Sequence, residues 1–164
     1  MYLIFDRMKY LIIIMTAMSK KEIMKFLVQG TLTGKLATAR KDGSPHVVPI
    51  WFILDDTSNN SNGDIIFTTS SGSVKAKNIR RDSRVSVCID DQKPPFSFVT
   101  MYGTAKIQQY NQNELVKWAS KIAGRYMGRK NAESYGKRNS AEGEVLVRVK
   151  PTRIIAEKAI ASWH

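Results

Sequence analysis

Residues 70–81 combine hydroxyl groups, a glycine and several cations within a short stretch. The loop SSGS at 70–73 comes first, and the segment after it, which can form a helix, carries four cations: Lys75, Lys77, Arg80 and Arg81. Such a loop offers hydroxyl and backbone N–H donors, and a helix N-terminus adds unpaired N–H groups and a partial positive charge. Because these groups and the lysine charges suit an anion, the stretch predicts a phosphate-binding site.

The same stretch has a simpler interpretation. Basic residues on a short helix are commonly a solvated surface, and loops rich in serine and threonine commonly only join two elements. The spacing GxxxxGK[ST] of nucleoside-triphosphate loops is absent, and no GxGxxG follows a strand. The sequence therefore indicates neither of these nucleotide-binding motifs, and at the level of this stretch both interpretations stay open.

Other reactive side chains are few. Cys88 is the single cysteine, so no disulfide framework is indicated, and its apolar, β-prone surroundings predict a small buried hydrophobe. With only His46 and His164, a histidine-rich metal centre is not expected. No paired carboxylates and no nucleophile–base pair stand out, so we assign no metal site, no catalytic residue and no proton donor.

The chain is long enough for one domain with a substantial core, since it has 164 residues of which 43% are hydrophobic. Its charge is strongly unbalanced: 26 Lys and Arg against 14 Asp and Glu give a formal net charge of +12. This excess favours a polyanionic partner, such as nucleic acid, a membrane surface or an anionic cofactor, without selecting among them.

The elements that must position these residues are mostly strands. β-prone runs occupy residues 34–40, 45–54, 65–69, 85–89, 96–107, 144–149 and 153–158. Pro49 interrupts the second run, as an edge strand or a bulge would allow, and Pro151 separates the last two. Asp42-Gly43 supplies a hairpin turn, and Gly103 is a candidate bulge.

Two amphipathic helices accompany the strands. The first begins at Ser19, which has capping-box spacing to Glu22, and ends at Gly30. The second begins at Asn111, and residues 125–138 form a short helix or a lid-like loop. Short tandem strands with two clear helices predict a small β-barrel with appended helices, a mainly β fold.

Residues 1–17 precede these patterns and include an apolar run at 10–15. This run is too short to span a bilayer and short for a signal peptide. We interpret 1–17 as an N-terminal extension, either a misassigned start or a flexible arm. Residues 18–164 are then one domain of a cytoplasmic protein with no membrane attachment.

Five runs, taken in order, resemble the pyridoxamine-phosphate-oxidase-like split barrel: LAT at 36–38, PHVVPIWF at 45–52, IFTT at 66–69, KAKNIRRDSR at 75–84 and VTMYGTA at 99–105. The sequence is most similar to the branch of F-420 (deazaflavin)-dependent oxidoreductases. The resemblance implies a split β-barrel of the FMN-binding type that forms a homodimer, with F-420, or alternatively FMN, bound between the subunits.

The resemblance also implies a role for nine residues. The cofactor phosphate would be held by Lys75 and Lys77, with Thr68, Thr69 and Ser70 beside it. The ring would lie along Val48, Pro49 and Ile50. Phe96 would close the pocket from the partner subunit.

The implied activity is hydride transfer between F-420 and a small unsaturated or quinone-like acceptor. One alternative is an FMN-binding relative of pyridoxamine-phosphate oxidase that acts as an oxidase or a flavin carrier. Another is a stress or heme-handling protein that uses the same barrel without redox turnover. A basic, nucleic-acid-binding β-barrel fits the charge, but the RNP aromatic pattern and zinc knuckles are absent.

Overall fold

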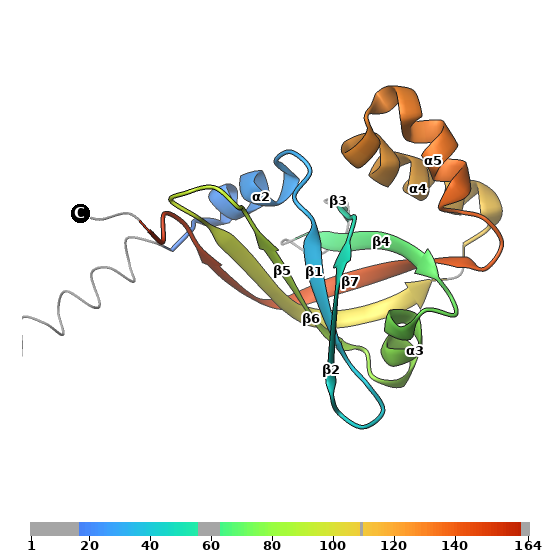
Figure 1. Cartoon of the computed structure of the whole chain (residues 1–164), viewed down its shortest axis with the longest axis horizontal. Helices are drawn as coiled ribbons and strands as arrows, with labels where there is room; N and C mark the ends of the chain where they lie inside the picture. Colours follow the sequence, from blue (N-terminus) through green and yellow to red (C-terminus); the bar gives the residue numbers. More distant parts are fainter. Residues whose placement is uncertain (1–16, 56–62, 109, 162–164) are drawn as a thin grey trace, which may run out of the picture.

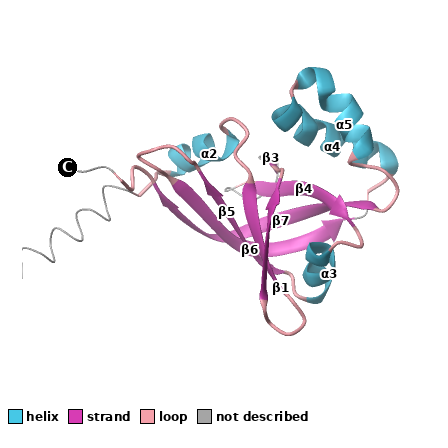
Figure 2. Cartoon of the chain, in the orientation of Figure 1, coloured by secondary structure: helices cyan, strands magenta, loops and turns pink. Residues whose placement is uncertain are grey.

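The computed structural model describes residues 17–55, 63–108 and 110–161 of the chain. In this part the strands are β1 (Gly34–Ala39), β2 (Pro45–Ile50), β3 (Ile53–Asp55), β4 (Asp64–Ser70), β5 (Arg84–Asp90), β6 (Phe98–Gln108) and β7 (Glu144–Glu157). The helices are α2 (Lys20–Val28), α3 (Val74–Arg81), α4 (Gln112–Met127), the 3-10 turn η1 (Arg129–Asn131) and α5 (Ala132–Arg138). Figure 2 shows that strands dominate the structure and that the helices lie around them.

The strands form one antiparallel sheet in the order β2-β1-β5-β6-β7-β4-β3. Its two edge strands, β2 and β3, follow each other in the chain and are separated only by Trp51 and Phe52. The sheet must therefore curl until its edges approach, and Figure 1 shows this strong curvature with α2, α3 and the α4–α5 pair placed around it. The expected mainly β split barrel with appended helices is confirmed.

The barrel interior is apolar. Its buried core includes Leu36, Phe52, Val87, Ile89 and Met101, all without exposed surface. Strand β4 is buried on both faces, because Ile65 and Phe67 point into this core while Ile66 packs with Leu115 of α4 and Leu146 of β7. Helix α4 thus covers the outside of β4 and β7 and closes one side of the barrel.

The capping motifs begin the helices where the sequence places them. Ser19 caps α2 and forms a complete capping box with Glu22, and Asn111 caps α4 by accepting from the N–H of Glu114. Glu22 also pairs with Lys158 at 2.5 Å, which ties α2 to the end of the sheet. The expected N-terminal extension covers residues 1–17, and residues 1–16 lie outside the part of the chain that the structure describes.

One expectation about the prolines is confirmed and another is wrong. Pro49 lies in an edge strand, as expected, but β2 runs through it, and the expected run 45–54 is divided at Trp51–Phe52 instead. Pro151 does not separate two strands, because β7 is continuous from residue 144 to 157. It lies opposite Gly103 at a shift of register: Tyr102 pairs with Arg153 and Gly103 pairs with Pro151, so β7 has one extra residue, Thr152, beside the proline.

The expectation that Cys88 is buried is wrong. The alternation of β5 sends Val85, Val87 and Ile89 into the core, so Cys88 faces outward and is half-buried. Hydrophobic neighbours along a strand do not by themselves say which face of the sheet a residue occupies.

No helix among the described residues has the length and hydropathy that crossing a membrane requires.

Candidate functional site

A cavity of about 250 Å³ opens where β2 ends, beside the start of α3. It is lined by Pro49, Ile50, Trp51, Thr68, Lys75, Ile122, Asn139 and Glu144. Its wall is apolar where β2 and α4 contribute to it, and the charged groups come from α3 and the start of β7. One side of the cavity therefore suits a flat apolar group, and another suits an anion.

Four of the nine residues that the sequence singles out line this cavity: Pro49, Ile50, Thr68 and Lys75. The structure thus brings the edge strand and the SSGS–α3 stretch together at one place. The two segments are far apart in the sequence. β2 is one edge of the sheet, and β4, which pairs with β7 and leads to α3, lies next to the other edge. The curl of the sheet therefore brings them together.

The other five residues do not line the cavity. Val48 is half-buried in β2 next to the lining residues, and Thr69 is buried in β4. Ser70 is exposed and its hydroxyl accepts from the N–H of Gly72. Lys77 is exposed on α3, two positions from Lys75 and hence on a different side of the helix. Phe96 is 40% exposed in the connection between β5 and β6, where its φ is 57°.

The start of α3 offers unused donors. Ser73 caps the helix by accepting from the N–H of Ala76 at 3.3 Å, and its hydroxyl lies 3.2 Å from that of Thr69. In the described part of the chain, the N–H groups of Val74 and Lys75 have no hydrogen-bond partner, and neither has the amine of Lys75. These groups are the donors of a helix N-terminus with the charge of Lys75 beside them, an arrangement that favours an anion.

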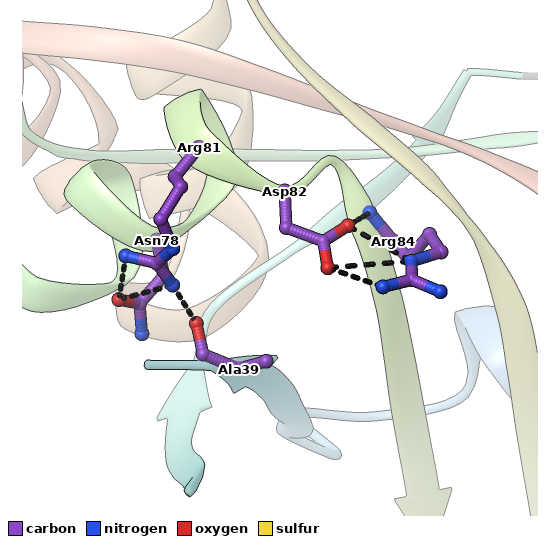
Figure 3. Close-up of polar contacts among 5 residues, drawn as sticks. All are labelled: Ala39, Asn78, Arg81, Asp82 and Arg84. Atoms are coloured by element: carbon purple, nitrogen blue, oxygen red, sulfur yellow. Dashed lines mark hydrogen bonds and ion pairs between the residues drawn. The ribbon is translucent and has the colours of Figure 1, made fainter. Parts of the chain in front are cut away.

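The arginines of this stretch hold the fold instead. Arg80 donates to the carbonyl of Ser71 at 2.6 Å. Figure 3 shows Arg81 between the side chain of Asn78 and the carbonyl of Ala39, which fastens α3 to β1. Arg84 forms an ion pair with Asp82 at 2.7 Å, and this contact lowers the pKa of Asp82 to about 2.

Trp51 is a lining residue that sequence reasoning missed. Its ring stacks on Tyr126 of α4, with centroids 5.0 Å apart and planes 3° apart. The Tyr126 hydroxyl donates to the carbonyl of Leu32 at 2.8 Å and accepts from the N–H of Phe52 at 3.2 Å. Burial raises the pKa of this hydroxyl, so it stays a neutral donor. Tyr126 is therefore held in place by two backbone groups, and it in turn supports Trp51 at the cavity wall.

Arg125 reinforces this arrangement from α4. It donates to the carbonyls of Leu27 at 2.9 Å, Gly30 at 3.0 Å and Phe52 at 3.0 Å. The first two belong to the C-terminal end of α2, where unpaired carbonyls and the helix dipole favour a cation. Residues 125 and 126 thus belong to the last turn of α4 and hold the connection between β2 and β3 in place. The short helix expected within 125–138 is α5.

Glu144 is the second lining residue with reactive chemistry that the sequence did not reveal. It begins β7 opposite Ser70, and the N–H of Ser71 donates to the carbonyl of Gly143 at 2.7 Å. Burial raises the pKa of its carboxyl, and the charge of Lys75 opposes that shift. Glu144 and Lys75 are the two titratable residues among those that line the cavity.

Asn139 and Ile122 complete the set that was missed, and only the packing of α4 and α5 brings them here. Across the described residues, no three His, Cys, Asp or Glu side chains gather where they could hold a metal ion.

Comparisons with known proteins show the family of the chain. The family model described as Pyridoxamine 5'-phosphate oxidase matches residues 19–158. No curated protein matches the sequence. Among solved structures, the conserved hypothetical protein Rv2991 from Mycobacterium tuberculosis is similar, with 27% identity over 91% of each chain and a TM-score of 0.74.

Two further solved structures are similar to the chain. An F420 reductase is 25% identical, with 78% of this chain and 92% of that chain covered and a TM-score of 0.61. The heme storage protein HutZ from Vibrio cholerae shares the fold at 16% identity, with 84% and 93% covered and a TM-score of 0.64. The chain therefore belongs to the pyridoxamine 5'-phosphate oxidase-like split-barrel family, in which its relatives include an F420 reductase.

Proposed function

We propose that this protein is an oxidoreductase that binds F-420, or alternatively FMN, in the cavity beside α3. It then transfers a hydride to a small unsaturated or quinone-like acceptor. The observation that carries the proposal is the placement of Lys75, at the start of α3, in one cavity with the apolar edge formed by Pro49, Ile50 and Trp51. Family membership supports a flavin-type cofactor in general.

The donor set fits a phosphate. Lys75 contributes a full charge and the first turn of α3 contributes the N–H groups of Val74 and Lys75. Thr68 adds a hydroxyl at the cavity wall, and Ser70 adds another at the end of β4. Phosphate groups are bound by several donors of these kinds together.

The opposite wall fits a flat ring. Pro49 and Ile50 come from an edge strand whose outer side has no neighbouring strand in the sheet, so its backbone can face a ligand. Trp51 and Ile122 add apolar surface and exclude water from one side. When bound, the cofactor supplies the hydride chemistry, and the protein holds its anionic end, orients its ring and selects the acceptor.

The size of the cavity favours a shared site. About 250 Å³ lies just below the range of cavities that enclose a ligand of drug size. One chain therefore encloses only part of a tricyclic cofactor with its side chain. A second subunit that contributes Phe96, or another exposed apolar residue, would complete the enclosure, and this supports a homodimer.

The choice between the two cofactors leans toward F-420. The F420 reductase is one of the similar structures, and a protein of net charge +12 attracts a polyglutamate-tailed cofactor more strongly than FMN. FMN stays the second candidate, because both cofactors present a phosphate and a flat ring to the same residues.

Separate titrations with FMN and F-420, followed by fluorescence, test the proposal. We expect Lys75→Ala to raise Kd by about tenfold or more, because it removes a charge-assisted hydrogen bond of roughly 1.5–3 kcal/mol. Lys77→Ala, on another side of α3, should cost less. The double variant should bind least of all.

The matched control is Lys117→Ala, the same substitution at an exposed position of α4 that does not line the cavity. Its Kd should equal that of the wild type. If the wild type binds neither cofactor but binds nucleic acid with a steep salt dependence, the oxidoreductase proposal is rejected.

A further inference from the structure

A carboxylate inside an anion-binding cavity is the feature that the proposed function leaves unexplained. Glu144 lines the same cavity as Lys75, although a carboxylate repels the phosphate that Lys75 would attract. Among the described residues, its side chain has no hydrogen-bond or ion-pair partner. The fold therefore keeps a negative charge beside a site for another negative charge.

Within the described residues, one cation acts on Glu144. Lys75 of α3 attracts its carboxylate and so opposes the rise in the pKa of the carboxyl that burial causes. On α5, Lys137 is paired with Glu133 at 2.7 Å and Arg138 lies over the ring of Tyr135. The cavity residues from β4, β2 and α4 are uncharged, and Glu142 is exposed two residues earlier in the chain.

We propose that Glu144 couples anion binding at Lys75 to the uptake of a proton from solvent. In the free protein the carboxylate of Glu144 and the ammonium of Lys75 attract each other. A phosphate beside Lys75 takes over that attraction and repels the carboxylate, so the neutral carboxyl becomes the favoured form. Glu144 thus adjusts the affinity of the site, an inference that rests on the proposed phosphate-binding role of Lys75.

The direction of the pH dependence follows. Burial already favours the neutral carboxyl of Glu144 in the free protein, and the bound anion favours it further. At low pH the group is neutral in both states and binding is strong. As the pH rises past the pKa of the free state and then that of the complex, the carboxylate forms and opposes the anion. Affinity therefore falls with rising pH because of Glu144.

Glu144→Gln tests the coupling with little risk to folding, because the backbone N–H of residue 144 donates to the carbonyl of Ala141 at 3.0 Å whatever the side chain is. Kd for FMN, and for F-420 in a parallel series, is measured between about pH 5 and pH 8. At the upper limit we expect Glu144→Gln to bind about tenfold more tightly than the wild type. Toward the lower limit the difference between the two should shrink, and titration of the ligand phosphate cancels in this ratio.

Calorimetry in two buffers of different ionisation enthalpy provides a second readout. Near about pH 6 the wild type should take up more protons on binding than Glu144→Gln does. Glu142→Gln is the control, because it removes the same charge at an exposed position outside the cavity, and it should behave as the wild type.

The outcomes separate the two proposals. If the wild type binds a cofactor but the ratio of the two Kd values does not change with pH, or if Glu144→Gln binds more weakly at every pH, proton coupling is wrong and the proposed function stands. If the wild type binds neither cofactor at any pH, both fail.

Discussion

At the scale of single residues, the hydroxyl of Tyr126 joins two segments that the sheet leaves apart. It donates to the carbonyl of Leu32, ahead of β1, and accepts from the N–H of Phe52, between β2 and β3. The ring of the same residue supports Trp51 at the cavity wall. Loss of the hydroxyl would leave the N–H of Phe52, a fully buried residue, without its partner.

We therefore expect Tyr126→Phe to lower the free energy of unfolding by about 1–2 kcal/mol, the cost of a buried donor left unpaired. Urea unfolding measures this. Tyr135→Phe is the matched control, because among the described residues the hydroxyl of Tyr135 has no hydrogen bond, and it should change stability by less than about 0.5 kcal/mol. Equal effects for the two variants would contradict the role assigned to Tyr126.

The sequence predicted half of the cavity and missed the other half for a physical reason. Lys75 carries a local signal, the start of a basic helix, whereas the resemblance to a family implied Pro49, Ile50 and Thr68. Glu144 and Asn139 reach the cavity through the packing of α4 and α5 and the β4–β7 pairing, and no local pattern announces either. Arg80 and Arg81 show the opposite situation. Their local pattern suits a ligand, but they donate hydrogen bonds to backbone carbonyls instead.

At the scale of elements, α5 depends on a close approach to α4. A Cβ placed on Gly136 would lie 2.0 Å from the hydroxyl oxygen of Ser120 and 2.7 Å from its Cα. Only glycine allows this contact, and Figure 1 shows the two helices side by side at one end of the molecule. Because α5 leads directly to Asn139 and Glu144, this contact also positions part of the cavity.

Gly136→Ala should destabilise the protein by about 1–3 kcal/mol through overpacking, and it should weaken cofactor binding. Thermal unfolding and the fluorescence titration measure the two effects. Gly124→Ala in α4 is the comparison: its nearest neighbour would be Ala132 Cβ at an ordinary 3.5 Å. Because alanine favours a helix by roughly 0.8–1 kcal/mol over glycine, this variant should be stabilised. The same substitution should therefore lower stability at residue 136 and raise it at residue 124, and this difference in sign tests the packing directly.

The sequence predicts the elements better than their continuity. The capped helices, the Asp42-Gly43 hairpin and the bulge at Gly103 are set by local chemistry, and all appear where expected. The extents of β2 and β7 depend on where each proline sits in the finished sheet. An edge strand accommodates Pro49, and the β-bulge within β7 next to Pro151 accommodates that proline.

At the scale of the whole molecule, an apolar surface remains outside the barrel on β1, β2, β5 and β6. Val47 is 60% exposed and Tyr102 is 42% exposed. A shallow groove next to them is lined by Ala37, Thr38, Ala39, Gly43, Pro45, Arg84, Val85, Ser86 and Tyr102. Exposed aromatic and β-branched side chains around such a groove are typical of a protein–protein interface. We expect the homodimer to form through this surface.

Sedimentation equilibrium should then show a dimer at micromolar concentration. Tyr102→Glu should shift it to a monomer, because the new charge would be buried without a partner. Lys117→Glu, a charge change at an exposed position of α4, should leave the dimer intact. A wild type that sediments as a monomer would refute the homodimer, whatever the variants do.

The two-residue connection between β2 and β3 limits how the molecule can adapt to ligands. Ile50 and Ile53 are three peptide units apart, so their Cα atoms cannot separate by more than about 11 Å. The two edge strands of the sheet are therefore held close together at this point and cannot move apart. A bulkier ligand would therefore need a shift of the other walls of the cavity, to which α4 and the end of α5 contribute Ile122 and Asn139.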